Sequence, residues 1–173
     1  KSVIYTLTGF QWLLLVAPFC VVQRDSHDKR RYENIVLEIC RKNAKSYVSA
    51  LICLILMILE PKYSRFFTVS STGALSRETF KQIKEFVATS PALEKHFKLL
   101  RDNIICKLTE SEYTPLNYST GTLDGRLPNA FLGDEVGSLP CSYPLEAMKS
   151  GQVLLKNKLG IIMSTKYPTV DNP

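Results

Sequence analysis

A basic loop and an acidic pair are the two parts of this sequence whose side chains could act on a phosphate. The basic loop is Arg41-Lys42-Asn43-Ala44-Lys45-Ser46, and an apolar run follows it. Between a strand and a helix, backbone N–H groups and the positive helix N-terminus can cradle phosphates. Lys45 would then reach the β and γ phosphates of a nucleotide, and the Ser46 hydroxyl would bind Mg²⁺. The stretch therefore predicts a phosphate-binding loop.

The loop departs from the usual pattern G-x-x-x-x-G-K-[ST] at both glycines, because Ile39 and Ala44 stand in their places. Taken alone, a Lys-Ser pair before a helix is more often a coincidence than a phosphate site. If the backbone at Ala44 needs a positive φ, its Cβ costs about 1–2 kcal/mol. If the backbone is right-handed, alanine suits the start of a helix. The sequence leaves the two conformations open.

The acidic pair, Asp134 and Glu135, ends a short apolar segment that begins at Ala130. In a parallel sheet the carboxyl ends of the strands line the ligand crevice. Asp134 could hold Mg²⁺ there, and Glu135 could orient and deprotonate an attacking water. A solvated turn is the other interpretation of such a pair. Together with the basic loop, the pair favours hydrolysis of a nucleotide.

Apolar spacing, caps and prolines predict the elements that must position these residues. The expected helices cover 7–16, 47–59, 75–88 and 143–156, and the expected strands cover 34–39, 66–70, 103–108, 130–133 and 159–163. Pro18 is expected to end the first helix, 24–31 to be a charged surface loop, 34–39 to be buried, and 109–128 to be rich in turns. Strands separated by helices predict an α/β fold of the P-loop NTPase type, a mostly parallel sheet flanked by helices on both faces.

Composition narrows the class of protein further. The chain has 173 residues, a net charge of +6 and 45% hydrophobic residues, which suits one domain with a possible polyanionic partner. Its five cysteines form no C-x-x-C pair, so neither a zinc site nor a disulfide framework is predicted. The apolar run at 47–59 is shorter than the roughly 20 residues that span a bilayer. The chain starts at Lys1, so we expect a fragment of a longer polypeptide.

Four stretches, in this order, resemble the ATPase domain of bacteriophage terminase large subunits. They are the basic loop with its apolar helix, Phe66 to Thr72, Leu123-Asp124-Gly125 ahead of the acidic pair, and Ile161 to Thr165. The resemblance covers nearly the whole chain from about Phe10 onward. Ala44 departs from it, because the family usually has glycine at this position.

The resemblance implies a role for each site residue. Gln11 would read the adenine, and Arg41 would stabilise charge developing on the γ-phosphate from within the same subunit. Lys42, Asn43 and Ala44 would complete the nucleotide-binding loop around Lys45 and Ser46. Ser46 and Asp134 would be the metal ligands and Glu135 the catalytic base. Ser164 and Thr165 would sense the γ-phosphate and couple hydrolysis to motion.

The implied function is that of a Mg²⁺-dependent ATPase motor that drives double-stranded DNA into a procapsid, in the cytoplasm of an infected bacterial host. The implied partners are double-stranded DNA, a portal protein and a small terminase subunit, with a homo-oligomeric ring in the full-length protein and no membrane. Residues 1–173 would be the ATPase domain, with the RNase H-like nuclease domain elsewhere. Two alternatives stay open, a helicase-like ATPase stimulated by nucleic acid and a nucleotide-binding scaffold without turnover. The Asp134–Glu135 pair argues against the scaffold, because a chain without catalysis has no need for a base.

Overall fold

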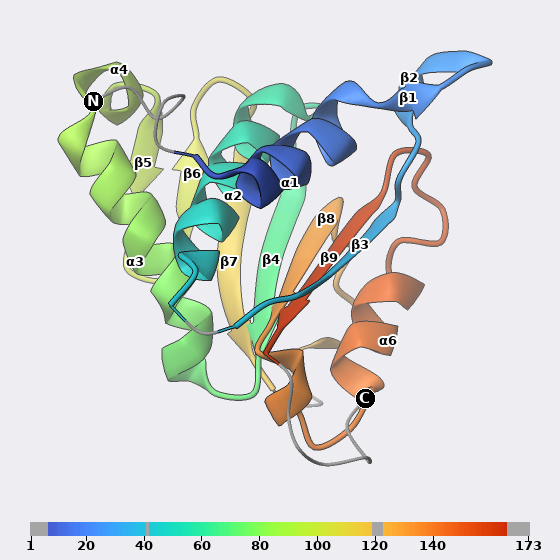
Figure 1. Cartoon of the computed structure of the whole chain (residues 1–173). Coiled ribbons are helices and arrows are strands. Elements are labelled where there is room, and N and C mark those ends of the chain that lie inside the picture. Colours follow the sequence, from blue (N-terminus) through green and yellow to red (C-terminus); the bar gives the residue numbers. More distant parts are fainter. Residues whose placement is uncertain (1–6, 41, 119–122, 166–173) are drawn as a thin grey trace.

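The computed structural model describes residues 7–40, 42–118 and 123–165, and alternating helices and strands fill these ranges (Figure 1). The elements are α1 (Gly9–Cys20), β1 (Val22–Gln23), β2 (Ser26–Arg30), β3 (Asn34–Glu38), α2 (Lys45–Leu59), β4 (Arg65–Ser70), α3 (Gly73–Thr89), α4 (Pro91–Glu94), β5 (Phe97–Leu99), β6 (Ile104–Cys106), β7 (Ser111–Asn117), β8 (Ala130–Asp134), the 3-10 turn η2 (Val136–Ser138), α6 (Tyr143–Ser150) and β9 (Leu159–Ser164). None of the described helices combines the length and the apolar character that crossing a membrane requires.

The main sheet has seven strands in the order β3-β9-β8-β4-β7-β6-β5. Five strands, from β3 to β7 in this order, are parallel, whereas β6 and β5 continue the sheet in antiparallel pairing. The prediction of a mostly parallel sheet is confirmed. Because β3, β9, β8 and β4 run in the same direction, their carboxyl ends meet at one edge, and the basic loop and the acidic pair both follow strands there.

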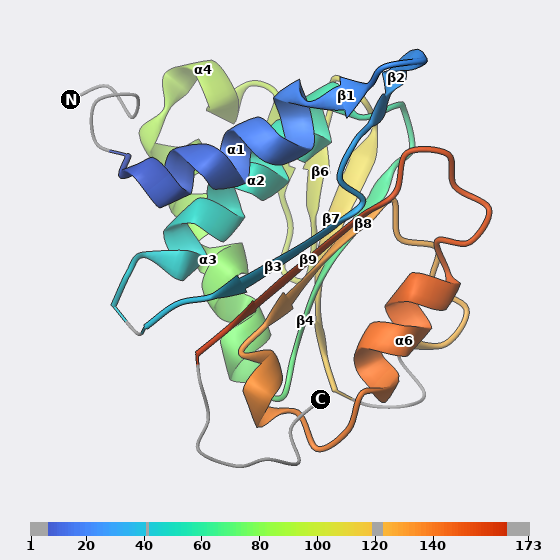
Figure 2. The same ribbon diagram turned by 45° about the vertical axis from the view of Figure 1, so that its right-hand side comes forward.

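Helices cover both faces of the sheet, as predicted. Figure 2 shows the sheet nearly edge-on, with α1, α2 and α3 on one side and α6 on the other. The first side holds the larger buried cluster, in which Ile52 and Leu56 of α2 are fully buried against strand residues such as Phe66. On the second side, Met148 of α6 packs against a smaller cluster that includes Phe131. Helix α2 is apolar on most of its sides because it packs between the sheet and α3, and α1 lies across it (Figure 1).

The prediction that Pro18 ends the first helix is wrong. Helix α1 runs from Gly9 to Cys20 with Pro18 inside its last turn. Proline lacks a backbone N–H and so removes one helical hydrogen bond. Pro18 is itself buried together with Leu14 and Leu15, so packing on the core holds the helix past the proline.

The segment before the phosphate loop differs from its prediction in two ways. Residues predicted as a charged loop form an antiparallel hairpin, β1–β2, that projects from one corner of the molecule (Figures 1 and 2). The next strand, β3, was predicted to be buried, but it is an edge strand that pairs with β9 alone. Its side chains alternate between exposed and half-buried, and Val36 is 74% exposed. An edge strand with one covered face shows this pattern.

Two further predictions fail in the second half of the chain. The turn-rich stretch contains β7, where Pro115 lies opposite Thr68 of β4. A proline fits there because β6 pairs with β7 only from Ser111 to Tyr113, so β6 does not extend to Pro115.

Helix α6 ends at Ser150 rather than near residue 156, and turns follow it. The apolar residues Val153 and Leu154, which extended the helical pattern, are exposed in these turns.

Candidate nucleotide-binding site

The basic loop connects β3 to α2 through a left-handed backbone. Lys42 has φ 68° and Ala44 has φ 55°, with Ala44 as the N-cap of α2. This decides the question that the sequence left open, because Ala44 adopts the conformation in which its Cβ costs about 1–2 kcal/mol. The Asn43 side chain donates to the Cys40 carbonyl at 2.9 Å and so closes the turn. Arg41 lies outside the described residues.

The acidic pair follows β8 as predicted, at the same edge of the sheet. Asp134 is 4% exposed, and Glu135 turns the chain with φ 51°. The Glu135 amide donates to Asp134 Oδ1 at 3.0 Å. Burial raises the pKa of Asp134, and the Glu135 charge adds to this, while the Lys45 ammonium partly opposes it. The two carboxylates therefore sit in different environments, one buried and one facing solvent in part.

Lys45 joins the loop to the acids. Its Nζ lies 2.5 Å from Glu135 Oε1 and 4.0 Å from Asp134 Oδ1. The other oxygen of Glu135, Oε2, accepts a hydrogen bond from Thr165 Oγ1 at 3.0 Å. Ser164 Oγ accepts from the Gly137 amide at 2.9 Å, just after the acidic pair. The structure thus brings together predicted residues from three separate stretches of the chain.

A cavity of about 380 Å³ opens beside these residues. Its lining comes from the loop, the start of α2, the acidic pair and α3, namely Lys42, Ala44, Lys45, Ser46, Tyr47, Glu78, Gln82 and Glu135. The volume falls in the range of small-molecule sites, roughly 300–1,000 Å³. Sequence reasoning missed Glu78 and Gln82. Their spacing of four residues puts them on one face of α3, but nothing in the sequence says that this face meets the loop.

Gln11 has a structural partner in this conformation. Its Oε1 accepts a hydrogen bond from the Thr8 amide at 2.9 Å at the start of α1, and the side chain is buried. Gln11 is not among the residues that line the cavity. Its contact with adenine stays a prediction.

The donor groups fit a magnesium ion that is held mainly by phosphates and water. Among the described residues, no group of three or more His, Cys, Asp or Glu side chains could hold a metal by itself. Mg²⁺ commonly takes one or two protein oxygens and completes its shell with phosphate and water. Ser46, which lines the cavity, and Asp134, 4.0 Å from the Lys45 ammonium, provide such oxygens.

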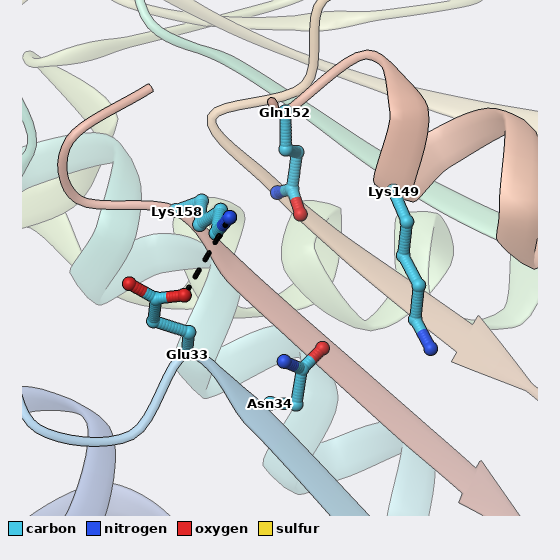
Figure 3. Close-up of a pocket in the computed structure, with 5 residues that line it drawn as sticks. All are labelled: Glu33, Asn34, Lys149, Gln152 and Lys158. Atoms are coloured by element: carbon cyan, nitrogen blue, oxygen red, sulfur yellow. Dashed lines mark ion pairs between the residues drawn. The ribbon is translucent and has the colours of Figure 1, made fainter. Parts of the chain in front are cut away.

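A second cavity, of about 160 Å³, lies at the opposite end of the sheet (Figure 3). Its residues come from the amino ends of β3 and β9 and from the segment around the end of α6, namely Glu33, Asn34, Lys149, Gln152 and Lys158. Glu33 pairs with Lys158 at 3.6 Å and with Lys29 at 3.4 Å. Gln152 donates to the carbonyls of Asn129 and Leu159. Glu33 and Gln152 are thus each held by contacts within the fold, which is typical of a structural polar cluster.

Comparison with known proteins gives the same fold and a family. The large terminase of bacteriophage HK97 matches with TM-score 0.77 and 21% identity, over 91% of this chain and 33% of that one. The Thermus phage P74-26 large terminase ATPase domain matches with TM-score 0.64 and 14% identity, over 78% and 59%. The large terminase of a thermophilic bacteriophage, in complex with ADP, matches with TM-score 0.62 and 12% identity, over 76% and 33%.

These identities show a shared fold, and the chain spans between about a third and three fifths of the proteins that it matches. The comparison with curated proteins gave no match. The sequence model of one family, described as the ATPase domain of the terminase large subunit, matches residues 16–170. Since this match covers most of the chain, the protein belongs to the family of terminase large subunit ATPase domains.

Proposed function

We propose that this protein is the Mg²⁺-dependent ATPase of a motor that packages double-stranded phage DNA. The observation that carries the proposal is the placement of Glu135 between Lys45 and Thr165. One carboxylate oxygen contacts the cation of the phosphate loop, and the other contacts the hydroxyl of the residue that follows β9. A general base needs this combination of a fixed orientation and an exchangeable partner.

ATP binding would release the base. Lys45 is the first residue of α2, where the helix dipole already places positive charge, so its ammonium needs an anionic partner. In this structure that partner is Glu135. The β and γ phosphates of ATP would take over the ammonium, so that Glu135 Oε1 could accept a hydrogen bond from water instead. Thr165 would keep Oε2 in place during the exchange.

Glu135 would then act on the attacking water. The carboxylate accepts a proton as the water oxygen bonds to the γ-phosphorus, and the bond to the bridging β–γ oxygen breaks to leave ADP. Ser46 and Asp134 would hold a Mg²⁺ ion, which would supply positive charge where negative charge develops on the phosphate oxygens. Lys42 and Asn43 form the loop around the phosphates, and Arg41 adds a positive charge near the γ-phosphate. Gln11 contacts the adenine once α1 has released it from Thr8.

The residues at the end of β9 are suited to couple ATP hydrolysis to a change elsewhere in the motor. Thr165 contacts Glu135, and Ser164 contacts Gly137 on the far side of the acidic pair. A change of partner at Glu135 Oε1 would therefore be transmitted to Thr165, directly after β9, through the hydrogen bond that Oε2 keeps. We assign the coupling of hydrolysis to DNA movement to these two residues. Double-stranded DNA, a portal protein, a small terminase subunit and further copies in a ring are the partners that this motor requires.

The 173 residues form, in this proposal, a single ATPase domain of a subunit whose nuclease domain lies elsewhere. The motor would work in the cytoplasm of the infected bacterium. The Lys45–Glu135 arrangement supports hydrolysis over the scaffold alternative, because a scaffold gains nothing from a carboxylate positioned at the phosphate loop. The helicase-like alternative is not favoured by any contact among the described residues.

Calorimetric titration with ATP and Mg²⁺ tests the site. Lys45→Ala should abolish binding, since it removes the charge that the phosphates contact. Asp124→Ala is the control, because Asp124 is exposed and bonds to the Tyr143 hydroxyl near α6. Binding by the control should equal that of the parent protein. Equal loss of binding in the two variants would mean that the phosphate site lies elsewhere.

A further inference from the structure

The hydroxyl of Ser70 is buried at the carboxyl end of β4 and has no hydrogen-bond partner among the described residues. Ser70 is the last residue of β4 and has an exposed fraction of 0%. Among the described residues its Oγ is one of few buried polar side-chain atoms that have no hydrogen bond. Buried polar atoms are nearly always paired, so an exception calls for a physical explanation. A ligand or water that the hydroxyl contacts in the working enzyme is such an explanation.

Strand register places Ser70 beside Asp134. In the parallel pair β4–β8, Val69 lies opposite Gly133. The next residues along the two strands are Ser70 and Asp134, and neighbouring strands lie about 4.8 Å apart. Asp134 is the residue that the proposed function assigns to Mg²⁺.

The two side chains also share a face of the sheet. Side chains alternate along a strand, and Phe66 belongs to the cluster beneath α2 and α3, whereas Phe67 belongs to the cluster beneath α6. Ser70 is four residues after Phe66 and therefore points to the α2 and α3 side. On β8, Leu132 belongs to the α2 and α3 side, so Asp134 points there as well. This is also the side of the Lys45 ammonium, 4.0 Å from Asp134 Oδ1.

We propose that Ser70 Oγ accepts a hydrogen bond from a water molecule of the hydrated Mg²⁺ ion that Asp134 anchors. Mg²⁺ keeps several of its waters when a protein binds it, and these waters need acceptors. A hydroxyl beside the anchoring carboxylate provides one, and it adds no charge to an already acidic corner. Ser70 is then a positioning residue for the metal. This inference rests on the proposed function, because it requires a nucleotide with Mg²⁺ at the site.

The experiment compares nucleotide binding with and without the metal in the full-length protein. Affinity for ATP-gamma-S is measured calorimetrically in Mg²⁺ and again in EDTA. Ser70→Ala should weaken binding in Mg²⁺ by about 10-fold, the lower end of what outer-shell partners of a metal contribute. Binding in EDTA should not change. Ser70→Thr keeps the hydroxyl and should bind in Mg²⁺ as the parent protein does.

Thr79 supplies a matched control within the same layer. Its Oγ1 is also buried and has no partner within the part of the chain that the structure describes, but it lies in the second turn of α3 instead of at a strand end. Thr79→Val should leave both affinities unchanged. Equal losses for Ser70→Ala in Mg²⁺ and in EDTA, or no loss in either, would overturn the proposal. Asp134→Asn separates the two hypotheses, because normal Mg²⁺-dependent binding by this variant would overturn the proposed metal site itself.

Discussion

Helix α2 carries an ion pair at each of its ends, and one pair is partly buried at a cavity whereas the other is buried in the fold. At the first residue, Lys45 pairs with Glu135, and at the C-cap, Glu60 pairs with Arg30. In both pairs the charge on the helix has the same sign as that end of the helix dipole, which is unfavourable. Each helix end therefore depends on a partner from another segment.

The surroundings of the pairs decide what each can do. The side chains of Arg30 and Glu60 are 6% and 8% exposed, and neither residue is part of the lining of the cavity at the site. The Lys45 and Glu135 side chains are 9% and 16% exposed and line the cavity of about 380 Å³. An anion that enters this cavity can contact the Lys45–Glu135 pair but not the Arg30–Glu60 pair. The comparison separates a pair that holds the fold from a pair whose partner can be exchanged.

The largest effect is expected from Glu135→Gln. Turnover by the full-length protein should fall by about 10²–10⁴, the usual contribution of a general base. Affinity for ATP should rise a few-fold, because Lys45 loses the carboxylate that competes with the phosphates. Steady-state turnover and a fluorescent nucleotide measure the two quantities. Unchanged hydrolysis would favour the scaffold alternative.

The Arg30–Glu60 pair should affect stability rather than turnover. Glu60→Ala should lower the free energy of unfolding by about 3–5 kcal/mol, because it leaves the Arg30 guanidinium buried without its carboxylate. Denaturant unfolding measures the loss. The double variant Arg30→Met with Glu60→Leu removes both charges and should recover most of the stability. If Glu60→Ala lowers turnover at saturating ATP while stability is unchanged, the pair belongs to the site and the comparison fails.

Ala44→Gly tests the backbone of the loop that begins α2. Glycine removes the Cβ from a left-handed position, so the free energy of unfolding should rise by about 1 kcal/mol. Gly125→Ala makes the reverse change, because Gly125 has φ 73° and open space around it, so an added Cβ meets backbone strain but no clash. The free energy of unfolding of this variant, measured by thermal unfolding, should fall by a similar amount. A destabilising Ala44→Gly would show that the loop is not left-handed at this residue.

The smallest effect concerns thiol reactivity at the start of the loop. Cys40 is exposed next to the phosphate loop, so ATP should slow its alkylation several-fold. The exposed thiols of Cys20 and Cys141 should react at the same rate with and without ATP. Cys53 should stay unmodified, because it is buried and burial raises the pKa of its thiol well above the usual range. Mass spectrometry of the alkylated protein reads each site, and equal slowing at all exposed thiols would contradict the location of the site.

The sequence predicted the elements whose signals are local. The apolar run of α2, the acidic end of β8 and the small hydroxyl residues at the end of β9 each depend on a few neighbouring residues, and all three lie at the expected edge. Strand order is not local, so the prediction of a buried β3 was wrong for a strand that lies at the sheet edge. The strand around Pro115 was missed because the prolines and glycines near it resemble a loop.

Contacts between distant segments were also beyond prediction at the site. Residue types identified Lys45, Asp134 and Glu135, but not the face of α3 that carries Glu78 and Gln82. No sequence pattern could show that Lys45 contacts Glu135, because that contact joins residues 90 positions apart. The φ of Ala44 was also beyond the sequence, since alanine is compatible with either conformation at a helix start.

The sheet order has a mechanical consequence. β9 separates β3, which carries the phosphate loop, from β8, which carries the acids, so the loop and the acids stand about two strand spacings apart, roughly 9–10 Å. The backbone hydrogen bonds of β9 to its two neighbours thus set the span across which catalysis must occur. Gly160, near the amino end of β9, leaves room for the Phe131 ring of β8, because a Cβ there would lie 2.9 Å from that ring. A larger residue at this position would force the ring to repack and would destabilise the sheet without touching the nucleotide.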